Sequence, residues 1–215
     1  MSTLAFALAA TIRHDGHGGV ADLLATPGDA AAWLDENREL VTQVLGRPFK
    51  GGANEGASGG DELVEGAGAR DGAADARDEL VRVRRAVRAL FARAVAPGPP
   101  SKADADRLMD ADAALRVVNR AAGRLGTMQL DWPEDGSPVT RWAGRTDDPV
   151  ALLVGAVGRS TIDFLSGPDR ARLRACPAAR CVKYFLQDDP RQTWCSPSCG
   201  NRERVNRHYR RRHGL

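Results

Sequence analysis

Residues 176–199 read CPAARCVKYFLQDDPRQTWCSPSC, and this stretch holds all four cysteines of the 215-residue chain. The cysteines form two close pairs, Cys176 with Cys181 and Cys195 with Cys199, and thirteen residues separate the pairs. Two such pairs joined by a short segment are the usual ligand pattern of one tetrahedral thiolate metal site. The spacing therefore predicts a structural metal site with these four cysteines as its ligands.

The residues around the cysteines predict how the four ligands are presented. Pro177 favours a tight turn between the first two cysteines, and residues 182–186 alternate in hydrophobicity as a strand does. Residues 187–190 are typical of a turn, so residues 192–194 are predicted to form the return strand of a hairpin. Ser196 and Pro197 are typical of a helix N-cap and first helical position, and Cys199 would then lie in the first turn of a helix. A tight turn, a hairpin and a ligand-bearing helix predict a treble-clef-like finger.

The helix that begins at Pro197 is expected to run to about residue 212 and to carry much of the positive charge. Residues 170–215 hold twelve Arg/Lys against three acids, a net charge of +9, while the rest of the chain sums to −6 and the whole to +3. A cationic end on an acidic protein indicates a polyanionic partner. Val205 and Tyr209 are expected to pack against the hairpin. The predicted nucleic-acid contacts are Arg202, Arg204, Asn206, Arg207, Arg210 and Arg211.

Residues 199–202 read Cys-Gly-Asn-Arg, preceded by Trp194 before the third cysteine and by the Tyr184–Phe185 pair after the second. This arrangement closely resembles the CGNR zinc-finger family. The resemblance implies a structural Zn²⁺ ion and a DNA-binding C-terminal domain of a bacterial transcription regulator. It also implies an N-terminal ABATE-type domain, which is described as a putative stress-induced transcription regulator.

The N-terminal part of the resemblance is one of pattern rather than of motif. The first helix of the family typically reads Leu-x-x-Asp-x-x-Asn-Thr, and this chain has Leu4, Ala7, Ala10 and Thr11 at those positions. Two alanines therefore replace polar side chains, which puts in question any ligand role that those side chains have in relatives.

Three other ligand arrangements are weighed against the four-cysteine site. His208 and His213 complete a C-x4-C…H-x4-H set with the first cysteine pair, but this choice leaves the second pair idle. An iron–sulfur cluster is compatible with the cysteine count, although the predicted hairpin and ligand-bearing helix favour zinc. His14 and His17 flank Asp15 in a Gly-rich segment, which we interpret as an exposed loop rather than a metal site.

The rest of the sequence predicts a mainly α protein with a small β-hairpin (α+β), divided into a helical regulatory domain at 1–169 and the finger at 170–215. A Gly-rich loop is expected at residues 51–72, which lack the order of a phosphate-binding loop. Ser101 and Asp104 resemble a capping box, and Arg82, Arg85 and Arg88 are expected on a solvated helix face. Helices are expected at about 4–12, 30–45, 73–95, 101–120, 149–167 and 168–174, and strands at 128–132 and 139–142.

These features favour a stress-response transcription regulator that binds DNA. The alternatives are an RNA-binding protein, or a protein-interaction module whose finger docks on the N-terminal domain or on the transcription machinery. No paired-carboxylate, nucleophile–base or open metal arrangement appears, so an enzyme is not expected. Without an export signal or a segment of about eighteen apolar residues, a cytoplasmic location without membrane contact is expected. The target sequence, the inducing signal, a small ligand and the oligomeric state are not determined by the sequence.

Overall fold

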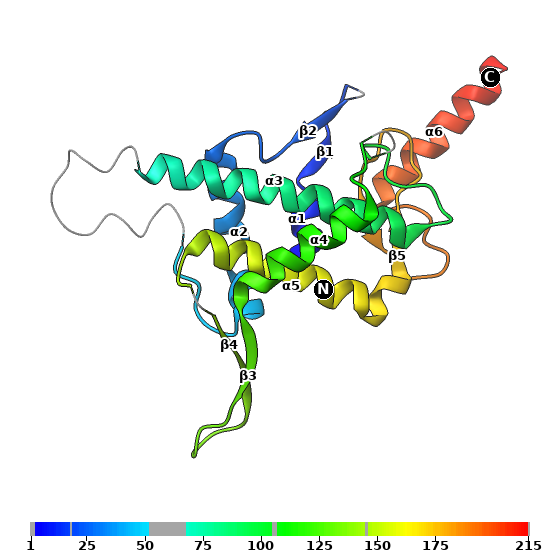
Figure 1. The fold of residues 1–215 in the computed structure, drawn as a ribbon. Coiled ribbons are helices and arrows are strands. Elements are labelled where there is room, and N and C mark those ends of the chain that lie inside the picture. The colour runs from blue at the N-terminus through cyan, green and yellow to red at the C-terminus, as the bar shows by residue number, and fades with distance from the viewer. Residues whose placement is uncertain (1–2, 18, 52–67, 105–106, 145, 215) are drawn as a thin grey trace.

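The computed structural model describes residues 3–17, 19–51, 68–104, 107–144 and 146–214 (Figure 1). The helices are α1 (Leu4–Ala9), α2 (Pro27–Leu45), α3 (Gly68–Val95), α4 (Ala111–Ala122), α5 (Pro149–Ser166) and α6 (Pro197–His213), with short 3₁₀ turns η1 (Gly123–Leu125) and η2 (Pro168–Arg172). Three antiparallel strand pairs complete the described part: β1 (Ile12–His14) with β2 (Val20–Asp22), β3 (Thr127–Asp131) with β4 (Val139–Ala143), and β5 (Leu173–Ala175) with β6 (Tyr184–Leu186). The expected mainly α fold with small β pairs is confirmed.

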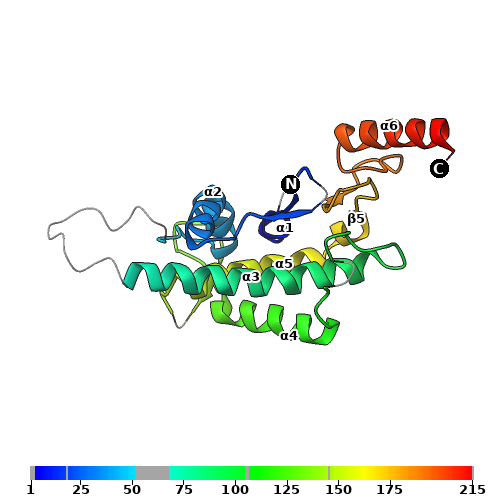
Figure 2. The same cartoon turned by 90° about the horizontal axis from the view of Figure 1, so that it is seen from above.

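α5 is the central helix of the body, by which we mean the described residues from 3 to 166. It contacts α1, α2, α3 and α4, and in Figure 2 α3 and α5 run side by side with α4 below them. Contrary to expectation, α5 is long and apolar enough to span a membrane, with a mean hydropathy of 1.2 over 18 residues. However, 56% of this helix is buried inside the protein, and a core helix has the same composition.

Two glycines on α5 allow the neighbouring segment to approach closely. A Cβ atom added at Gly158 would lie 2.5 Å from the backbone N of Ala122, and one at Gly155 would lie 2.6 Å from the Leu125 side chain. Contacts this short do not occur between real side chains and backbone, so these positions require glycine for the packing of α4 and η1 on α5.

Capping residues set several helix ends where the sequence predicts them. Thr26 and Asp29 form a reciprocal capping box at the start of α2, and Gly46, with a φ of 65°, ends that helix in the left-handed conformation. Asp148 accepts hydrogen bonds from the first N–H groups of α5. These side chains satisfy backbone groups that have no partner within the helix, so the ends are encoded locally.

The first and third helices differ from the expected ranges, and the helix expected at 168–174 is wrong, since the short turn η2 ends at Arg172 and strand β5 begins at Leu173. α1 ends at Ala9, because the chain turns at Thr11, whose hydroxyl donates to the Leu8 carbonyl, and Ile12 pairs with Asp22 in a hairpin. α3 begins at Gly68, so the end of the expected Gly-rich loop is helical, whereas residues 52–67 lie outside the described residues. The apolar stripe of α3 is buried along its length: Leu80, Val83, Val87, Leu90 and Phe91.

After α5 the chain returns to the body before it forms the finger, by which we mean residues 173–214. Leu173 and Tyr184, from β5 and β6, are buried in the main core. The Tyr184 ring lies edge-on to Phe91, with 5.5 Å between ring centroids, and Phe91 in turn contacts Phe6 and Phe164. The base of the finger is therefore part of the core of the body, whereas α6 extends away from it (Figures 1 and 2).

Candidate metal centre and basic helix

The four cysteine sulfurs lie together, and the atoms are all within 4.8 Å of one another. The Sγ atoms of Cys181 and Cys195 are 3.7 Å apart, and those of Cys195 and Cys199 are 3.6 Å apart. Four sulfurs arranged tetrahedrally at about 2.3 Å from a central ion would be about 3.8 Å from one another. All four cysteines are free, and disulfide bonding would need sulfurs about 2.0 Å apart. The donor set thus fits one metal ion bound by four thiolates.

Each cysteine is positioned by a local backbone feature. The N–H of Cys176 donates to the Lys183 carbonyl, and the N–H of Cys181 donates to the Ala178 carbonyl, so the first pair lies on a closed turn. Arg180, with a φ of 63°, bends the chain just before Cys181. At the second pair, the Ser196 hydroxyl accepts from the N–H of Cys199, which places this ligand in the first turn of α6 as the sequence predicts.

The strand partner within the finger is not the expected one. β6 pairs with β5, which precedes the first cysteine, with Ala175 opposite Tyr184. Residues 192–194 form no strand, and side chains bond to the carbonyls of this segment instead. The side-chain amide of Gln187 donates to the Gln192 carbonyl, and the side-chain amide of Gln192 donates to the Trp194 carbonyl. The predicted hairpin between the cysteine pairs is therefore wrong, although strand β6 is correct.

Electrostatic coupling among the thiols favours a bound cation. The pKa of the Cys176 thiol is lowered because the thiols of Cys181 and Cys195 donate hydrogen bonds to its sulfur, which also accepts from the Cys195 N–H. The pKa of Cys195 is raised because it serves as a donor to Cys176 and Cys181 and because it is partly buried. A central cation removes this conflict, since all four sulfurs can then be ionised at once.

The predicted nucleic-acid contacts lie on α6 and face solvent. The arginines at 202, 204, 207, 210 and 211 are exposed, and Asn206 is half-buried. Within the part of the chain that the structure describes, no ion pair involves an arginine of α6; Arg202 donates a hydrogen bond to the Ala179 carbonyl. Glu203, the one acid of α6, accepts from the Ala179 N–H and thereby fixes the helix to the cysteine turn.

The expected packing of Val205 and Tyr209 is wrong. Val205 is 68% exposed and Tyr209 is 56% exposed, and the Tyr209 ring stacks on His213 of the same helix at 4.0 Å. The hairpin that was expected to cover them does not form, since β6 pairs with β5 instead. Gly200 instead provides the contact with the finger, with the Trp194 ring 3.3 Å from where its Cβ would be. His208 and His213 are exposed and lie outside the described metal-ligand group.

A buried arginine that sequence reasoning placed in solvent joins the finger to the body. Arg88 is 4% exposed and donates to the Asp104 carboxylate at 2.8 Å, to the Ala9 carbonyl at 2.7 Å and to the Ser101 hydroxyl at 2.9 Å. It also donates to the carbonyl of Val182, the residue after the second cysteine ligand, at 3.2 Å. One guanidinium therefore contacts α1, the segment after α3 and the finger.

Ser101 and Asp104 belong to this junction and do not form the expected capping box. The Ser101 hydroxyl donates to the Val182 carbonyl, and the Tyr184 hydroxyl donates to Asp104, each at 2.8 Å. Burial, and next the Asp104 carboxylate, raise the pKa of the Tyr184 phenol. α4 consequently starts at Ala111.

The burial of Arg88 could have been predicted from its position on the helix. One continuous helix face is made by residues 80, 83, 84, 87, 88 and 91, so Arg84 and Arg88 lie on the apolar stripe.

The fold and site define a class of protein: a helical body joined by buried contacts to a treble-clef-like metal-binding finger with a basic helix. Residues 2–168 match the ABATE family, described as "putative stress-induced transcription regulator", and residues 172–212 match the CGNR zinc finger. The chain belongs to the ABATE family and carries a C-terminal CGNR zinc finger. No curated protein matches the chain.

Proposed function

We propose that this protein is a transcription regulator that binds DNA through α6, with Zn²⁺ held by Cys176, Cys181, Cys195 and Cys199. The observation that carries the proposal is the charge on α6. Residues 197–213 contain six arginines and one acid, a net charge of +5, and the acid is already bonded to the cysteine turn. Such a surface attracts phosphates, which arginine contacts in bidentate fashion.

The donor set and spacing support zinc as the ion. Four thiolates leave no coordination position open for water, so the ion would be structural rather than catalytic. In a 4Fe–4S cluster each cysteine binds a different iron atom, and in a 2Fe–2S cluster two cysteines bind each iron, so either cluster spreads the four sulfurs further apart than a single ion does. The proposal assigns the protein no catalytic role.

The shape of α6 supports a groove contact. The helix projects from the molecule, and even its apolar side chains Val205 and Tyr209 are exposed, so most of its circumference is accessible (Figure 2). A single α-helix fits the major groove of B-DNA, where Asn206 could read a base edge and Val205 could contact a thymine methyl group. Most of the arginines would contact phosphates and thereby position the helix without reading sequence.

The test is binding of the full-length, zinc-loaded protein to a labelled duplex, measured by fluorescence anisotropy at several salt concentrations. If about five phosphates are neutralised, log K should fall with log[salt] with a slope of about −4.5. The double variant Arg207→Ala/Arg210→Ala should weaken binding and reduce the slope by about 1.8. Arg116→Ala/Arg120→Ala, which removes two exposed arginines from α4, is the matched control and should change neither value.

Two results would contradict the proposal. One is the absence of duplex binding by the zinc-loaded protein even at low salt. The other is tighter binding to a structured RNA than to duplex DNA at equal salt, which would identify RNA as the partner.

A further inference from the structure

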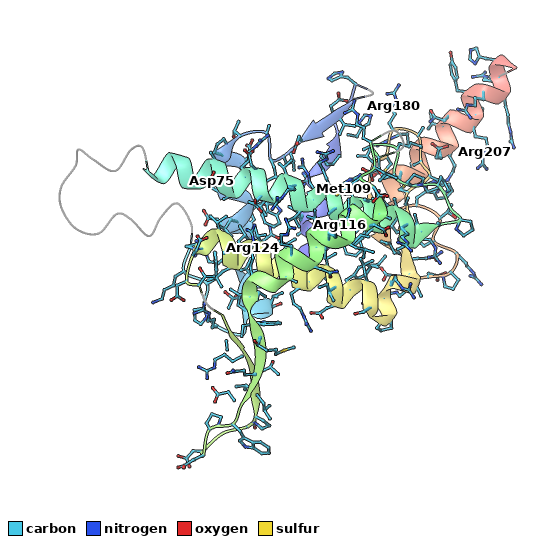
Figure 3. All side chains as sticks on the ribbon, in the orientation of Figure 1. Asp75, Met109, Arg116, Arg124, Arg180 and Arg207 are labelled. Carbon is cyan, nitrogen blue, oxygen red and sulfur yellow. The ribbon has the colours of Figure 1, made fainter. Side chains whose placement is uncertain are left out.

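A small cavity lies where the hairpin β1–β2 of the body meets the finger. Its volume is about 220 Å³, and it lies beside the start of α6. The body contributes Arg13 and His14 of β1, and the finger contributes Arg180, Lys183 and Arg202. Figure 3 shows Arg180 between the hairpin and α6, away from Arg207 further along that helix. We call this cavity the junction pocket.

The junction pocket is lined by cations and by three of the four clustered cysteines, Cys181, Cys195 and Cys199, and no carboxylate lines it. Arg13, Arg180 and Lys183 take part in no side-chain hydrogen bond or ion pair within the described residues, and Arg202 donates only to a backbone carbonyl. An ion bound by four thiolates carries a net charge of −2, which two of the four cations would offset. A surplus of about two positive charges therefore remains at the pocket.

His14 brings a hydrogen-bond donor that has no acceptor. Its Nδ1 accepts a hydrogen bond from the Gly16 N–H at 2.8 Å, so the proton of the neutral ring is on Nε2. The Nε2 atom is shielded from solvent and has no partner in the described part of the chain. A buried donor without an acceptor is costly, and such a group indicates a ligand that accepts hydrogen bonds.

Hydroxyl groups and the start of α6 complete the wall of the pocket. Ser196 and Ser198 line it, with their Oγ atoms 2.9 Å apart; Ser196 is the N-cap of the 17-residue helix α6, and Ser198 lies in its first turn. The positive end of the helix dipole adds to the field of the four cations. The pocket is smaller than the roughly 300–1,000 Å³ of most small-molecule sites, a size that suits one anionic group rather than a whole nucleotide.

We propose that the junction pocket binds one phosphate group through Arg13, Arg180, Lys183 and Arg202 and the Nε2–H of His14. The phosphate could belong to the backbone of a nucleic acid or be free in solution, since the chemistry is the same. If it belongs to DNA, the inference rests on the proposed function and adds a contact made by the body to those of α6.

Arg13→Ala in the full-length, zinc-loaded protein tests whether the pocket binds a phosphate of the nucleic-acid backbone. Arg13 is exposed and lies outside the finger and the core, so the fold should be retained, as a thermal melt would check. Duplex affinity should fall about tenfold, and the salt slope should decrease by about 0.9, the contribution of one phosphate contact. Arg116→Ala on α4 is the matched control and should leave both values unchanged (Figure 3).

A titration with inorganic phosphate tests whether the pocket binds free phosphate. The nitrogen resonances of His14 are followed by NMR while phosphate replaces chloride at constant ionic strength and pH. Saturable shifts in the natural protein, lost in Arg13→Ala, show that the pocket takes free phosphate. His14→Phe should weaken the effect, and His14→Gln, which keeps an N–H donor at similar reach, should restore part of it.

The outcomes separate the two proposals. If Arg13→Ala and His14→Phe leave duplex binding unchanged and phosphate produces no saturable shift, the pocket is not a phosphate site, even where Arg207→Ala/Arg210→Ala weakens DNA binding. If the zinc-loaded protein binds no duplex but phosphate shifts His14 saturably, the pocket is supported and the DNA-binding function is refuted.

Discussion

The body and the finger have different kinds of core. In the body, buried aliphatic and aromatic side chains from five helices pack together. In the described part of the finger, the buried cluster has five residues, and three of them are cysteines. The body can gain its stability from apolar area removed from water. A segment of about 40 residues cannot do so, and we expect it to need the metal to fold. The two regions are therefore expected to differ in their source of stability, and Arg88 makes hydrogen bonds to both of them.

The junction makes the two regions dependent on each other. Tyr184 packs on Phe91 in the body core, while the Val182 carbonyl, next to the ligand Cys181, accepts from Arg88 and Ser101. Lys102 donates to the carbonyls of Pro177 and Ala178 in the cysteine turn. The orientation of the metal centre relative to the body is therefore set by buried polar contacts, which are more directional than apolar packing.

Metal removal should have the largest effect, because it should unfold the finger and leave the body folded. Because structural zinc contributes about 10–16 kcal/mol in small fingers, chelation or Cys199→Ser should unfold residues 176–214 while the core helices stay folded. Amide hydrogen exchange measures this directly: finger amides should lose protection, and those of α5 should keep it. Protected finger amides after complete chelation would show that the finger folds without metal.

Arg88→Met should have the next largest effect, because it leaves the buried Asp104 carboxylate without its charged partner. We expect a loss of about 3–5 kcal/mol in the free energy of unfolding, measured by urea denaturation. Arg85→Met, three residues earlier on the exposed face of α3, is the matched control and should cost no more than about 0.5 kcal/mol. The double variant Arg88→Met/Asp104→Leu should recover part of the loss; equal losses for Arg85 and Arg88 would refute the junction.

Tyr184→Phe should have a moderate effect that depends on pH. Removing the hydroxyl leaves the Oδ2 atom of Asp104 and the Ser101 N–H without this partner, while Arg88 still bonds to Oδ1, and we expect a cost of about 1–3 kcal/mol near neutral pH. Because the pKa of Tyr184 is raised in the folded state, the natural protein should lose stability as the pH rises above about 10, the value for an unfolded tyrosine. The variant lacks this titration. Urea denaturation should therefore show a smaller difference in the free energy of unfolding between the two proteins at high pH than near neutral pH.

Asp22→Asn should have the smallest effect, confined to the body. Burial alone would raise the pKa of Asp22, but hydrogen bonds from Arg84 and the Leu24 N–H lower it overall. A lowered folded-state pKa gives stability that is present above the unfolded value of about 3.8 and is lost as the pH falls through the folded value. The variant should thus show a shallower acid transition by circular dichroism, whereas Asp135→Asn in the exposed β3–β4 loop should not.

The locally encoded features are the ones that the sequence predicted well. The cysteine spacing, the Ser196 cap of α6, the start of α5 at Pro149 and the strand pair β3–β4 all depend on residues close in the chain. The division of the chain at residues 169 and 170 stays a prediction. The capping box at Ser101 and the solvated Arg88 were wrong because the partners of these side chains come from distant segments, whereas the strand at 192–194 is replaced by contacts of Gln187 and Gln192 within one loop.

What the sequence alone determined is therefore the four-cysteine cluster, the helix that carries Cys199 and the charge on that helix, because cysteine spacing, capping and charge act over a few residues. Only the tertiary structure decided that β6 pairs with β5, that Arg88 is buried, that Val205 and Tyr209 are exposed, and that His14 meets the finger. These outcomes depend on which distant segments bury one another, and an arginine on an apolar stripe is stable inside only once Asp104 and the Val182 carbonyl are placed against it.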